Sequence, residues 1–281
     1  MSHVRVTVVG SVNLDLVAAL PRLPRPGETL TATGLRRVPG GKGANQALAA
    51  HRLGLPVRLL AAVGTDPEAD TALELLRGEG VGLDRLQRVT EPTGLALIAV
   101  DPAGETTIVV VPGANAALQV HAQDVAGAEA VITVLEVPDR AVTAAAKHAT
   151  GLFVLNASPA RAVPPDVLRR TDLVVVNRAE YAALPGLLAA RAVAVTDGPR
   201  GAVLLRDGTQ VAAASPPPVT AVDGTAAGDA FIGAAVAGLL RGLPDTEWLT
   251  RACAAGALAA TQPGAQPSLP SAAEIDEILS R

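Results

Sequence analysis

The sequence predicts a three-layer αβα fold, in which helices cover both faces of a central, mainly parallel β-sheet and a small second β-sheet is added as a lid. Three observations predict it. Short apolar runs alternate with helix-like segments along most of the chain, which is typical of parallel sheets. Two segments have strand patterns with no helix between them. The length of 281 residues suits one large α/β domain, here taken as residues 1–281.

The first quarter of the chain establishes the alternation. A β-branched run, Val4–Val9, ends at a glycine and predicts a buried strand. Helical periodicity over Gly43–Leu53 stops before Gly54, a favourable residue for a helix end. Val57–Val63 predicts a second buried strand. Asp66–Arg77 predicts a helix, because acidic residues in its first turns suit the helix dipole.

The same alternation continues to the end of the chain. Further strands are expected at Val131–Leu135, Phe153–Leu155, Leu173–Val176 and Ala192–Val195. Helices are expected near 139–149, 164–170 and 178–184, and three more close the chain at Gly228–Leu240, Thr246–Ala260 and Ala272–Leu279. This order predicts repeated strand–helix units and therefore a parallel sheet.

Two segments interrupt this rhythm. Residues 16–38 contain three prolines and then an alternating stretch, Glu28–Arg36. Residues 93–111 read as a hairpin with a turn at 102–104. We interpret both as strands of a small separate sheet that acts as a lid over the main domain. The alternative is that they are extra edge strands of the main sheet.

Composition excludes several classes of function. The net charge is −4, the chain holds only one Trp, one Tyr and two Phe, and basic residues never run beyond a pair, so we expect no nucleic-acid partner. A single cysteine, Cys253, precludes a disulfide within the chain. No apolar run approaches the ~18 residues of a membrane span. We therefore expect a cytoplasmic protein without membrane contact.

The first chemistry-bearing segment, Gly10–Asp15, directly follows the first strand. Ligands of open parallel sheets bind beyond the carboxyl ends of the strands. Asn13 and Asp15 alternate in an extended segment and so share a face, where an amide and a carboxylate suit neighbouring hydroxyls of a polyol. The alternative is a turn in which both side chains cap backbone groups.

The second segment, Pro39–Gln46, places paired glycines before a helix. Its Lys42 is followed by glycine rather than Ser or Thr, so it is not a Walker A loop, and it lacks the third glycine of a dinucleotide-binding fingerprint. Close backbone approach to a ligand explains the glycines; a simple glycine-rich turn is the alternative. Asn45, just inside the helix, is in position to face the same ligand.

The third segment, Asp223–Phe231, opens a helix near Gly228. Free N–H groups and the positive end of the helix dipole form a phosphate site, and the small residues leave the backbone uncovered. A carboxylate at Asp229 is placed to accept a proton from a substrate hydroxyl while the N–H groups stabilise a transferring phosphoryl group. The alternative is an ordinary acidic residue at a helix start.

The three segments, in this order and spacing, resemble the ribokinase (PfkB) family of carbohydrate kinases. The resemblance extends over most of the chain, and Gly40–Gln46 and Gly264–Ser268 are more similar to the ribokinases of the family than to its fructose or nucleoside kinases. It is also carried by Gly64–Asp66, Gly113–Asn115, Leu155–Asn156 and Asn177–Glu180. The expected fold is therefore ribokinase-like.

The resemblance implies a role for each matching residue. Asp229 matches the catalytic base. The anion hole corresponds to Ala226, Ala227 and Gly228, and sugar contacts to Asn13, Asp15, Gly40, Gly41, Lys42, Asn45 and Glu136. Nucleotide contacts correspond to Asn177, Glu180, Thr196, Gly198, Gly201 and Gly228, with Cys253 near the adenine. Glu180 also belongs to the magnesium shell, and the monovalent-cation loop corresponds to Asp223, Thr225, Ala259, Gln262, Gly264 and Ser268.

As a whole, the resemblance implies ATP-dependent phosphorylation of D-ribose at its 5-hydroxyl, with Mg²⁺ and K⁺, by a homodimer joined through the lid. Alternatives are a kinase for deoxyribose, tagatose or fructose, and a sugar-binding regulator without catalysis. Two departures stand out: Gly224 stands in the cation loop where the family usually has Thr, and on the nucleotide side the span from Glu180 to Ala192 is short.

Overall fold

The main body is an eight-stranded sheet in a computed structural model that describes residues 5–281; Val4, the first residue of the predicted first strand, lies outside them. The strand order is β14-β13-β12-β11-β10-β9-β1-β4. Six strands are parallel: β1 (Val6–Val9), β4 (Val57–Leu60), β9 (Ala130–Val134), β10 (Leu152–Asn156), β11 (Leu173–Asn177) and β12 (Val193–Thr196). The antiparallel strands β13 (Ala202–Arg206) and β14 (Thr209–Ala214) complete one edge. The mainly parallel sheet is thus confirmed.

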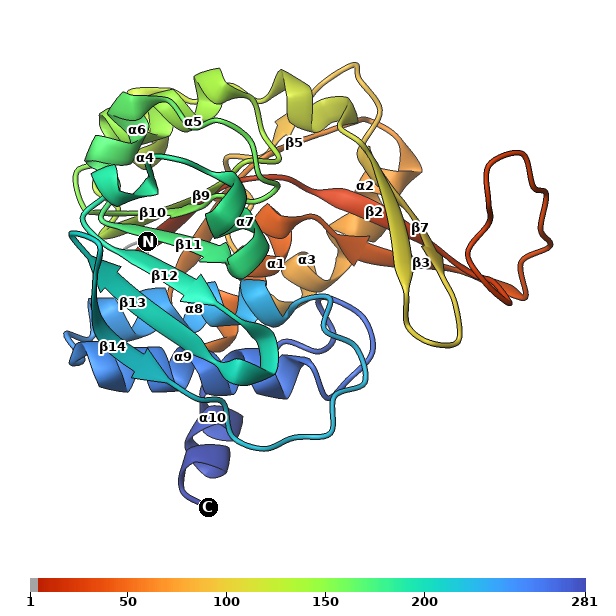
Figure 1. The fold of residues 1–281 in the computed structure, drawn as a ribbon. Helices are drawn as coiled ribbons and strands as arrows, with labels where there is room; N and C mark the ends of the chain where they lie inside the picture. The colour runs from red at the N-terminus through yellow and green to blue at the C-terminus, as the bar shows by residue number, and fades with distance from the viewer. Residues whose placement is uncertain (1–4) are drawn as a thin grey trace.

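Helices cover both faces of this sheet, as Figure 1 shows. One face carries α1 (Lys42–Arg52), α8 (Ala227–Leu240) and α9 (Asp245–Ala259), with α10 (Ala272–Leu279) against α9. The opposite face carries α4 (Ala122–Val125), α5 (Asp139–His148), α6 (Pro165–Arg170) and α7 (Arg178–Ala183). Successive strand residues alternate between the two apolar cores: Val8 belongs to the first and Val9 to the second. This is the predicted three-layer arrangement.

Helices α1 and α8 approach each other unusually closely. A Cβ atom on Gly233 of α8 would lie 2.8 Å from the Cβ atom of Ala49 on α1, so only a glycine fits at this contact. The close approach places the first turns of the two helices side by side. Both of these turns carry predicted site residues.

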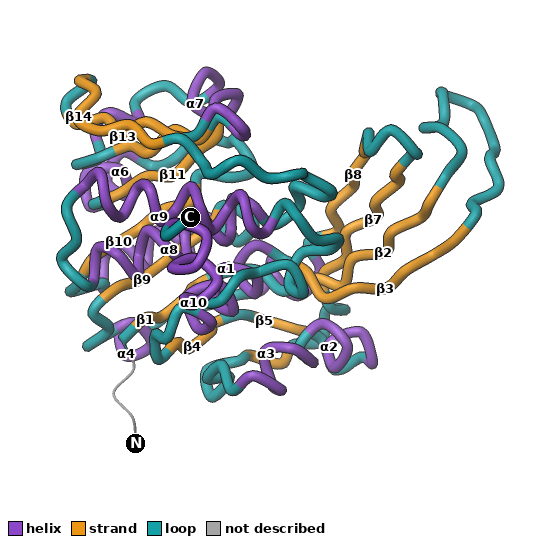
Figure 2. Tube along the Cα trace, turned by 90° about the horizontal axis from the view of Figure 1, so that it is seen from below, coloured by secondary structure: helices purple, strands orange, loops and turns teal. Residues whose placement is uncertain are grey.

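The small sheet is separate from the main one, so its strands are not extra edge strands of the main sheet (Figure 2). It has the order β3-β2-β7-β8, formed by β2 (Asn13–Ala19), β3 (Gly34–Gly40), β7 (Gly94–Val100) and β8 (Thr106–Val111). Strand β2 begins at Asn13 and therefore includes the polar pair predicted to share a face. The alternating stretch Glu28–Arg36 is only partly strand, because residues 20–33 form a loop that projects from the molecule (Figure 1).

Local differences from the sequence prediction have local causes. The helix predicted over 66–77 is divided into α2 (Pro67–Ala72) and α3 (Glu74–Glu79) at Leu73, where φ −100° and ψ 0° distort the right-handed helix. The strand predicted over 57–63 is interrupted at Ala61, and β5 (Ala62–Val63) pairs with β6 (Gln87–Arg88). Short 3₁₀ turns occur at η1 (Gly113–Ala117), η2 (Leu187–Ala189) and η3 (Gly198–Arg200).

The hairpin β13–β14 was missing from the sequence prediction, although its signal is present. Asp207 and Gly208 form a two-residue turn, and both have positive φ, 50° and 74°. An Asp-Gly pair between apolar runs is a strong hairpin signal, because such turns need positive φ at both residues. Among the described residues, no helix is both long and apolar enough to cross a membrane.

Candidate active site

Asn13 and Asp15 lie on one face of β2, both almost fully buried, as their alternation predicted. Gly40 pairs with Asn13 across β2 and β3, and a side chain at Gly40 would overlap the Asp15 carboxylate. The glycine therefore keeps space open beside the carboxylate. Asn13 is held by Asn115 of η1, which donates from Nδ2 to Asn13 Oδ1 at 2.8 Å.

The start of α1 is held by side chains from other elements. Its N-cap residue, Gly41, has φ 90° and provides no side-chain cap. Instead, Glu136, two residues beyond β9, accepts a hydrogen bond from the Lys42 N–H at 3.0 Å and another from the Ser11 hydroxyl. The Ser11 Oγ in turn accepts from the Gly43 N–H at 3.2 Å. The glycine-rich segment is therefore fixed to the carboxyl ends of β1 and β9.

Asp229 lies in the first turn of α8 and is buried. Asn45 Nδ2 donates to its Oδ2 at 2.9 Å, and Gln46 Nε2 donates to its Oδ1 at 2.8 Å. Gln46 Nε2 also donates to Asn156 Oδ1, at the end of β10, at 3.0 Å. Asn45 therefore points toward Asp229, and both oxygens of the Asp229 carboxylate have amide donors.

Burial and neighbouring charges shift the pKa values of this cluster. Burial raises the pKa of Asp229, and the charge of Lys42 partly offsets it. Burial, followed by the charges of Glu136 and Asp229, raises the pKa of Asp15 to about 7. Burial alone would lower the pKa of Lys42, but four carboxylates, including Glu180, outweigh it and raise that pKa. Lys42 thus interacts electrostatically both with predicted sugar contacts, such as Asp15, and with Glu180, a predicted nucleotide contact.

The start of α8 has the open geometry expected of a phosphate site. Its N-cap residue, Ala226, makes no side-chain cap bond, and the Ala227 N–H donates to the Gly224 carbonyl at 3.2 Å. A Cβ atom on Gly228 would have no atom within 4 Å. Gly228 is exposed, so the first turn of the helix has open space beside it.

The predicted nucleotide residues follow the ends of β11 and β12. Asn177 and Glu180 form a reciprocal capping box at the start of α7, with both hydrogen bonds at 2.8 Å. Thr196 ends β12, and its hydroxyl donates to the Val176 carbonyl at 3.3 Å. The short span between Glu180 and Ala192 holds the end of α7 and the η2 turn.

A shallow cavity of about 330 Å³ lies at the same edge and includes Arg178, Asp197 and Gly201 in its lining. Gly198 opens η3, and Gly201 follows it with φ 90°, where a side chain would overlap the Ala214 carbonyl. Arg200 and then Arg178 form hydrogen bonds with Asp197 and lower its pKa to about 2.

Cys253 lies in α9 and is buried, and its Sγ donates to the Ala214 carbonyl at 3.6 Å. Burial raises the pKa of this thiol to about 11. The same carbonyl adjoins Gly201, so Cys253 is a small core residue close to this predicted nucleotide contact.

The proposed cation residues come from two loops that the structure joins. Asp223 Oδ1 accepts from the Thr225 N–H at 3.0 Å, and Asp223 Oδ2 accepts from the Gly264 N–H at 2.8 Å. Burial alone would raise the pKa of Asp223, but a hydrogen bond from the Thr225 hydroxyl, followed by the two backbone bonds, outweighs it and lowers that pKa. Ala259 ends α9, Gln262 is exposed in the following turn, and the Ser268 hydroxyl donates to the Ala265 carbonyl at 2.9 Å.

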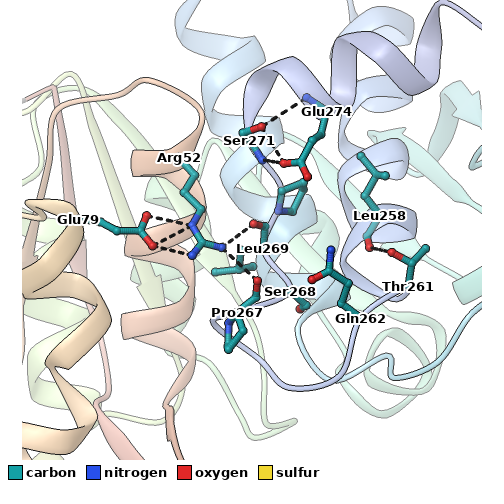
Figure 3. Close-up of a pocket in the computed structure, with 11 residues that line it drawn as sticks. Arg52, Glu79, Leu258, Thr261, Gln262, Pro267, Ser268, Leu269, Ser271 and Glu274 are labelled. Carbon is teal, nitrogen blue, oxygen red and sulfur yellow. Dashed lines mark hydrogen bonds and ion pairs between the residues drawn. The ribbon is translucent and has the colours of Figure 1, made fainter.

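The second of these loops is also held from behind by Arg52, the last residue of α1 (Figure 3). Its Nη1 donates to the carbonyls of Gln266 at 2.9 Å and Leu269 at 2.6 Å. Its remaining N–H groups bind the Glu79 carboxylate, with Nη2 at 2.6 Å. A cavity of about 420 Å³ adjoins this contact, and its lining includes Gln262 and Ser268.

Comparison with known proteins identifies the family. Residues 4–272 match the model of the pfkB family carbohydrate kinases. The chain belongs to this family. It is 34% identical to a ribokinase of Haemophilus influenzae over 300 residues, covering 97% of both chains, and 33% identical to a ribokinase of Bacillus subtilis over 291 residues, covering 98% and 99%. The structure of Arabidopsis thaliana ribokinase complexed with ribose and ATP matches with TM-score 0.89 and 29% identity over both full chains.

The ribokinase-like fold of this carbohydrate kinase is thus confirmed, but four polar residues of its site lay outside the predicted set: Ser11, Gln46, Asn115 and Asn156. Three had a usable signal. Ser11 and Asn156 directly follow or end buried strands, at the sheet edge where ligands bind. Gln46 is next to Asn45 in the glycine-rich segment. Arg52 had no local signal for its role at the loop, because the carbonyls that it binds there, of Gln266 and Leu269, lie more than two hundred residues further along the chain.

Proposed function

We propose that this carbohydrate kinase transfers the γ-phosphoryl group of ATP to the 5-hydroxyl of D-ribose, giving ribose 5-phosphate and ADP. One observation carries the proposal. Asp229 is a buried carboxylate with both oxygens hydrogen-bonded, at the uncapped start of α8, and it interacts electrostatically with Asp15. A base, a phosphate site and a polyol site therefore adjoin one another, which a sugar-binding regulator would not require.

In this reaction Asp229 takes the proton of the sugar hydroxyl. At the same time the oxygen of that hydroxyl forms a bond to the γ-phosphorus. The bond from that phosphorus to the β,γ-bridging oxygen breaks, and its electron pair leaves on ADP. Backbone N–H groups at Ala226, Ala227 and Gly228 stabilise the negative charge of the transferring phosphoryl group. The raised pKa of Asp229 suits a general base, because a base works best with a pKa nearer the working pH.

The sugar side offers several hydroxyl partners. Asn13 and Asp15 share a face, and the buried Asn45 Oδ1 has no hydrogen-bond partner among the described residues. A buried acceptor without a partner is costly, and a sugar hydroxyl would satisfy it. Two relatives named ribokinase, and a matching structure complexed with ribose and ATP, favour ribose over deoxyribose, tagatose or fructose.

Two ions complete the proposal. Mg²⁺ is commonly bound through one or two carboxylates together with substrate phosphates, and Glu180, oriented by Asn177, offers such a carboxylate. It would neutralise charge on the ATP phosphates. K⁺ would be held by the loops that Asp223 joins, among Thr225, Ala259, Gln262, Gly264 and Ser268. It would stabilise the loop that leads into the phosphate site at α8.

We also assign a lid role to the small sheet. Directly opposite residues of a sheet share a face, so the register places Ala96, Ile98 and Val110 on the Asp15 face, where they form an apolar cover for a sugar. Such a cover would exclude water, a competing acceptor.

The other face of the small sheet carries four exposed apolar residues: Leu35, Leu97, Val109 and Val111. We propose that this face joins two copies in a homodimer in the cytoplasm, because an exposed apolar patch on a sheet favours burial against another surface. Light scattering at micromolar concentration should give the mass of a dimer. A monomer would contradict the assignment.

The test of the catalytic proposal is Asp229→Asn. We expect turnover to fall by about a hundredfold to ten-thousandfold, the usual contribution of a general base. Ribose binding, measured by calorimetry, should be retained. Asp276→Asn, an exposed carboxylate paired with Arg251, is the matched control and should keep wild-type rates. Wild-type rates in Asp229→Asn would overturn the proposal.

A further inference from the structure

We infer that Gln46 and Asn156 form a hydrogen-bond relay that keeps Asp229 ionised and oriented, so that Gln46 is a positioning residue for the catalytic base. This inference rests on the proposed role of Asp229 and goes beyond it. The relay begins at the backbone of β11. The Val175 carbonyl accepts from Asn156 Nδ2 at 3.1 Å. A carbonyl only accepts, so this bond determines which end of the Asn156 amide faces the strand.

That orientation determines the next bond. With Nδ2 directed at β11, Asn156 presents Oδ1 to Gln46, which donates from Nε2 at 3.0 Å. The same Nε2 donates its second proton to Asp229 Oδ1 at 2.8 Å. Both protons of the Gln46 amide group are therefore used. If this amide were flipped, its oxygen would face the oxygens of Asn156 and Asp229, which also only accept hydrogen bonds. The relay makes Gln46 a fixed donor to the carboxylate.

A fixed donor stabilises the charged form of a carboxylate over the neutral form. This matters because Gln46 is 0% exposed and Asp229 only 4% exposed, so water cannot provide the same hydrogen bond. Burial raises the pKa of Asp229, while Lys42, Gln46 and Asn45 lower it. Without the relay, burial would keep a larger fraction of the base protonated at neutral pH.

Gln46 also retains an unfavourable feature that its role as a donor explains. Its Oε1 is buried and has no hydrogen-bond partner among the described residues. Such an acceptor costs free energy, and a residue selected only for packing would not require it. The feature is consistent with an amide whose orientation is dictated by Asp229 and Asn156.

Other charges around Asp229 stay constant when Gln46 is changed. Lys42 of α1, Glu136 beyond β9 and Asp15 of β2 all interact electrostatically with Asp229. Asp15 has a raised pKa and would also affect pH profiles, but through sugar binding. Measuring kcat at saturating sugar and ATP therefore isolates the ionisation of the base.

The experiment compares kcat against pH for wild type, Gln46→Met, Asn156→Ala and the double variant. Methionine keeps the length of glutamine and removes the donor. We expect Gln46→Met to shift the low-pH side of the kcat profile, its acid limb, to a higher pH by about one unit. That is the size expected for one hydrogen bond to a charged group. At low pH kcat should fall about tenfold and recover toward wild type as pH rises, while the sugar KM stays constant.

Asn156→Ala should move the limb in the same direction by a smaller amount, and the double variant should match Gln46→Met, because Asn156 acts through Gln46. Gln123→Met, at an exposed position of α4, is the matched control and should leave the profile unchanged. The relay would be overturned if Gln46→Met lowered kcat equally at every pH. It would also be overturned if the pH shifts of the two single variants added in the double variant. If Gln46→Met does not fold, the test uses Asn156→Ala. An acid limb at the wild-type pH in folded Asn156→Ala would then overturn the relay. Wild-type rates in Asp229→Asn would instead reject the proposed base.

Discussion

The proposed sugar side of this site and its proposed nucleotide side are built differently. On the sugar side, hydrogen bonds join α1 to α8 and to the ends of β9 and β10, and Asn115 of η1 binds Asn13 of β2. The carboxyl groups of Asp15 and Asp229 there are buried and have raised pKa values. On the nucleotide side, bonds such as the box between Asn177 and Glu180 are short-range and exposed. The pKa of Asp197 there is lowered to about 2.

Glycines show the same difference. Side chains at Gly40 or Gly43 would overlap neighbouring atoms, whereas on the nucleotide side only Gly201 is as tightly packed, and a Cβ atom on Gly198, Gly224 or Gly228 would have no atom within 4 Å. The sugar side is thus assembled before ligands arrive, and the nucleotide side keeps room for one. Substitutions on the sugar side should therefore change stability and pH dependence, and those on the nucleotide side should mainly change ATP affinity.

Gly43→Ala should have the largest effect, because its Cβ atom would overlap the backbone of Gly10 and Ser11. We expect the free energy of unfolding to fall by about 3 kcal/mol or more, the upper end for overpacking, with loss of sugar binding. Gly228→Ala is the matched variant on the open side. It should unfold no more easily than wild type in a denaturant titration, yet bind ATP more weakly. Equal destabilisation of both variants would contradict the comparison.

Asp15→Asn should remove a pH dependence of stability. The folded pKa of Asp15, about 7, lies above the unfolded value of about 3.9, so the folded state binds the proton more tightly. Wild-type stability contributed by this group is present at low pH and is lost as pH rises through about 7. The melting temperature of Asp15→Asn, relative to wild type, should therefore increase between about pH 5 and about pH 8. A constant difference would be evidence against the raised pKa.

The same variant should bind ribose about 10- to 100-fold more weakly above neutral pH, because it loses a hydrogen bond to a charged acceptor. In wild type the sugar KM should fall as pH rises through the Asp15 pKa. In Asp15→Asn it should be high and independent of pH. Steady-state kinetics over that range checks both.

Glu180→Gln tests the nucleotide side with little disturbance of the fold, because glutamine also closes a capping box. We expect the KM for ATP to rise about tenfold as Mg²⁺ loses a carboxylate, with the ribose dissociation constant unchanged. Glu274→Gln is the matched control, since Glu274 forms the same box with Ser271 in α10. A rise in ATP KM in both variants would point to a general effect of the substitution.

Arg52→Met should give the smallest effect on activity, acting on the proposed cation loop, and it also removes the ion pair with Glu79. Removing its hydrogen bonds to the carbonyls of Gln266 and Leu269 should loosen the loop and raise the K⁺ concentration for half-maximal activation several-fold. Arg241→Met removes a comparable bond, to the Leu53 carbonyl, away from the loop and serves as control. If rates never depend on K⁺, the proposed cation site is rejected along with this role of Arg52.

Sequence reasoning reached the residues whose placement is local. Asn13 and Asp15 share a face because strands alternate, and Asp229 opens a helix because small residues precede it. It did not reach the relay, because Gln46 and Asn156 are 110 residues apart in the sequence. Gln46 of α1 meets Asn156 at the end of β10 and meets Asp229 because α1 packs against α8. That packing depends on the fit between Gly233 and Ala49, which no local pattern reveals.

The most direct test of the central claim is the product formed from ATP and single sugars. Purified protein with Mg²⁺ and K⁺ would be assayed against ribose, deoxyribose, tagatose and fructose, and the product identified by phosphorus NMR. The account predicts the highest kcat/KM for ribose and phosphate on its 5-oxygen. A higher kcat/KM for another sugar, or no phosphorylation of any of them, would contradict it.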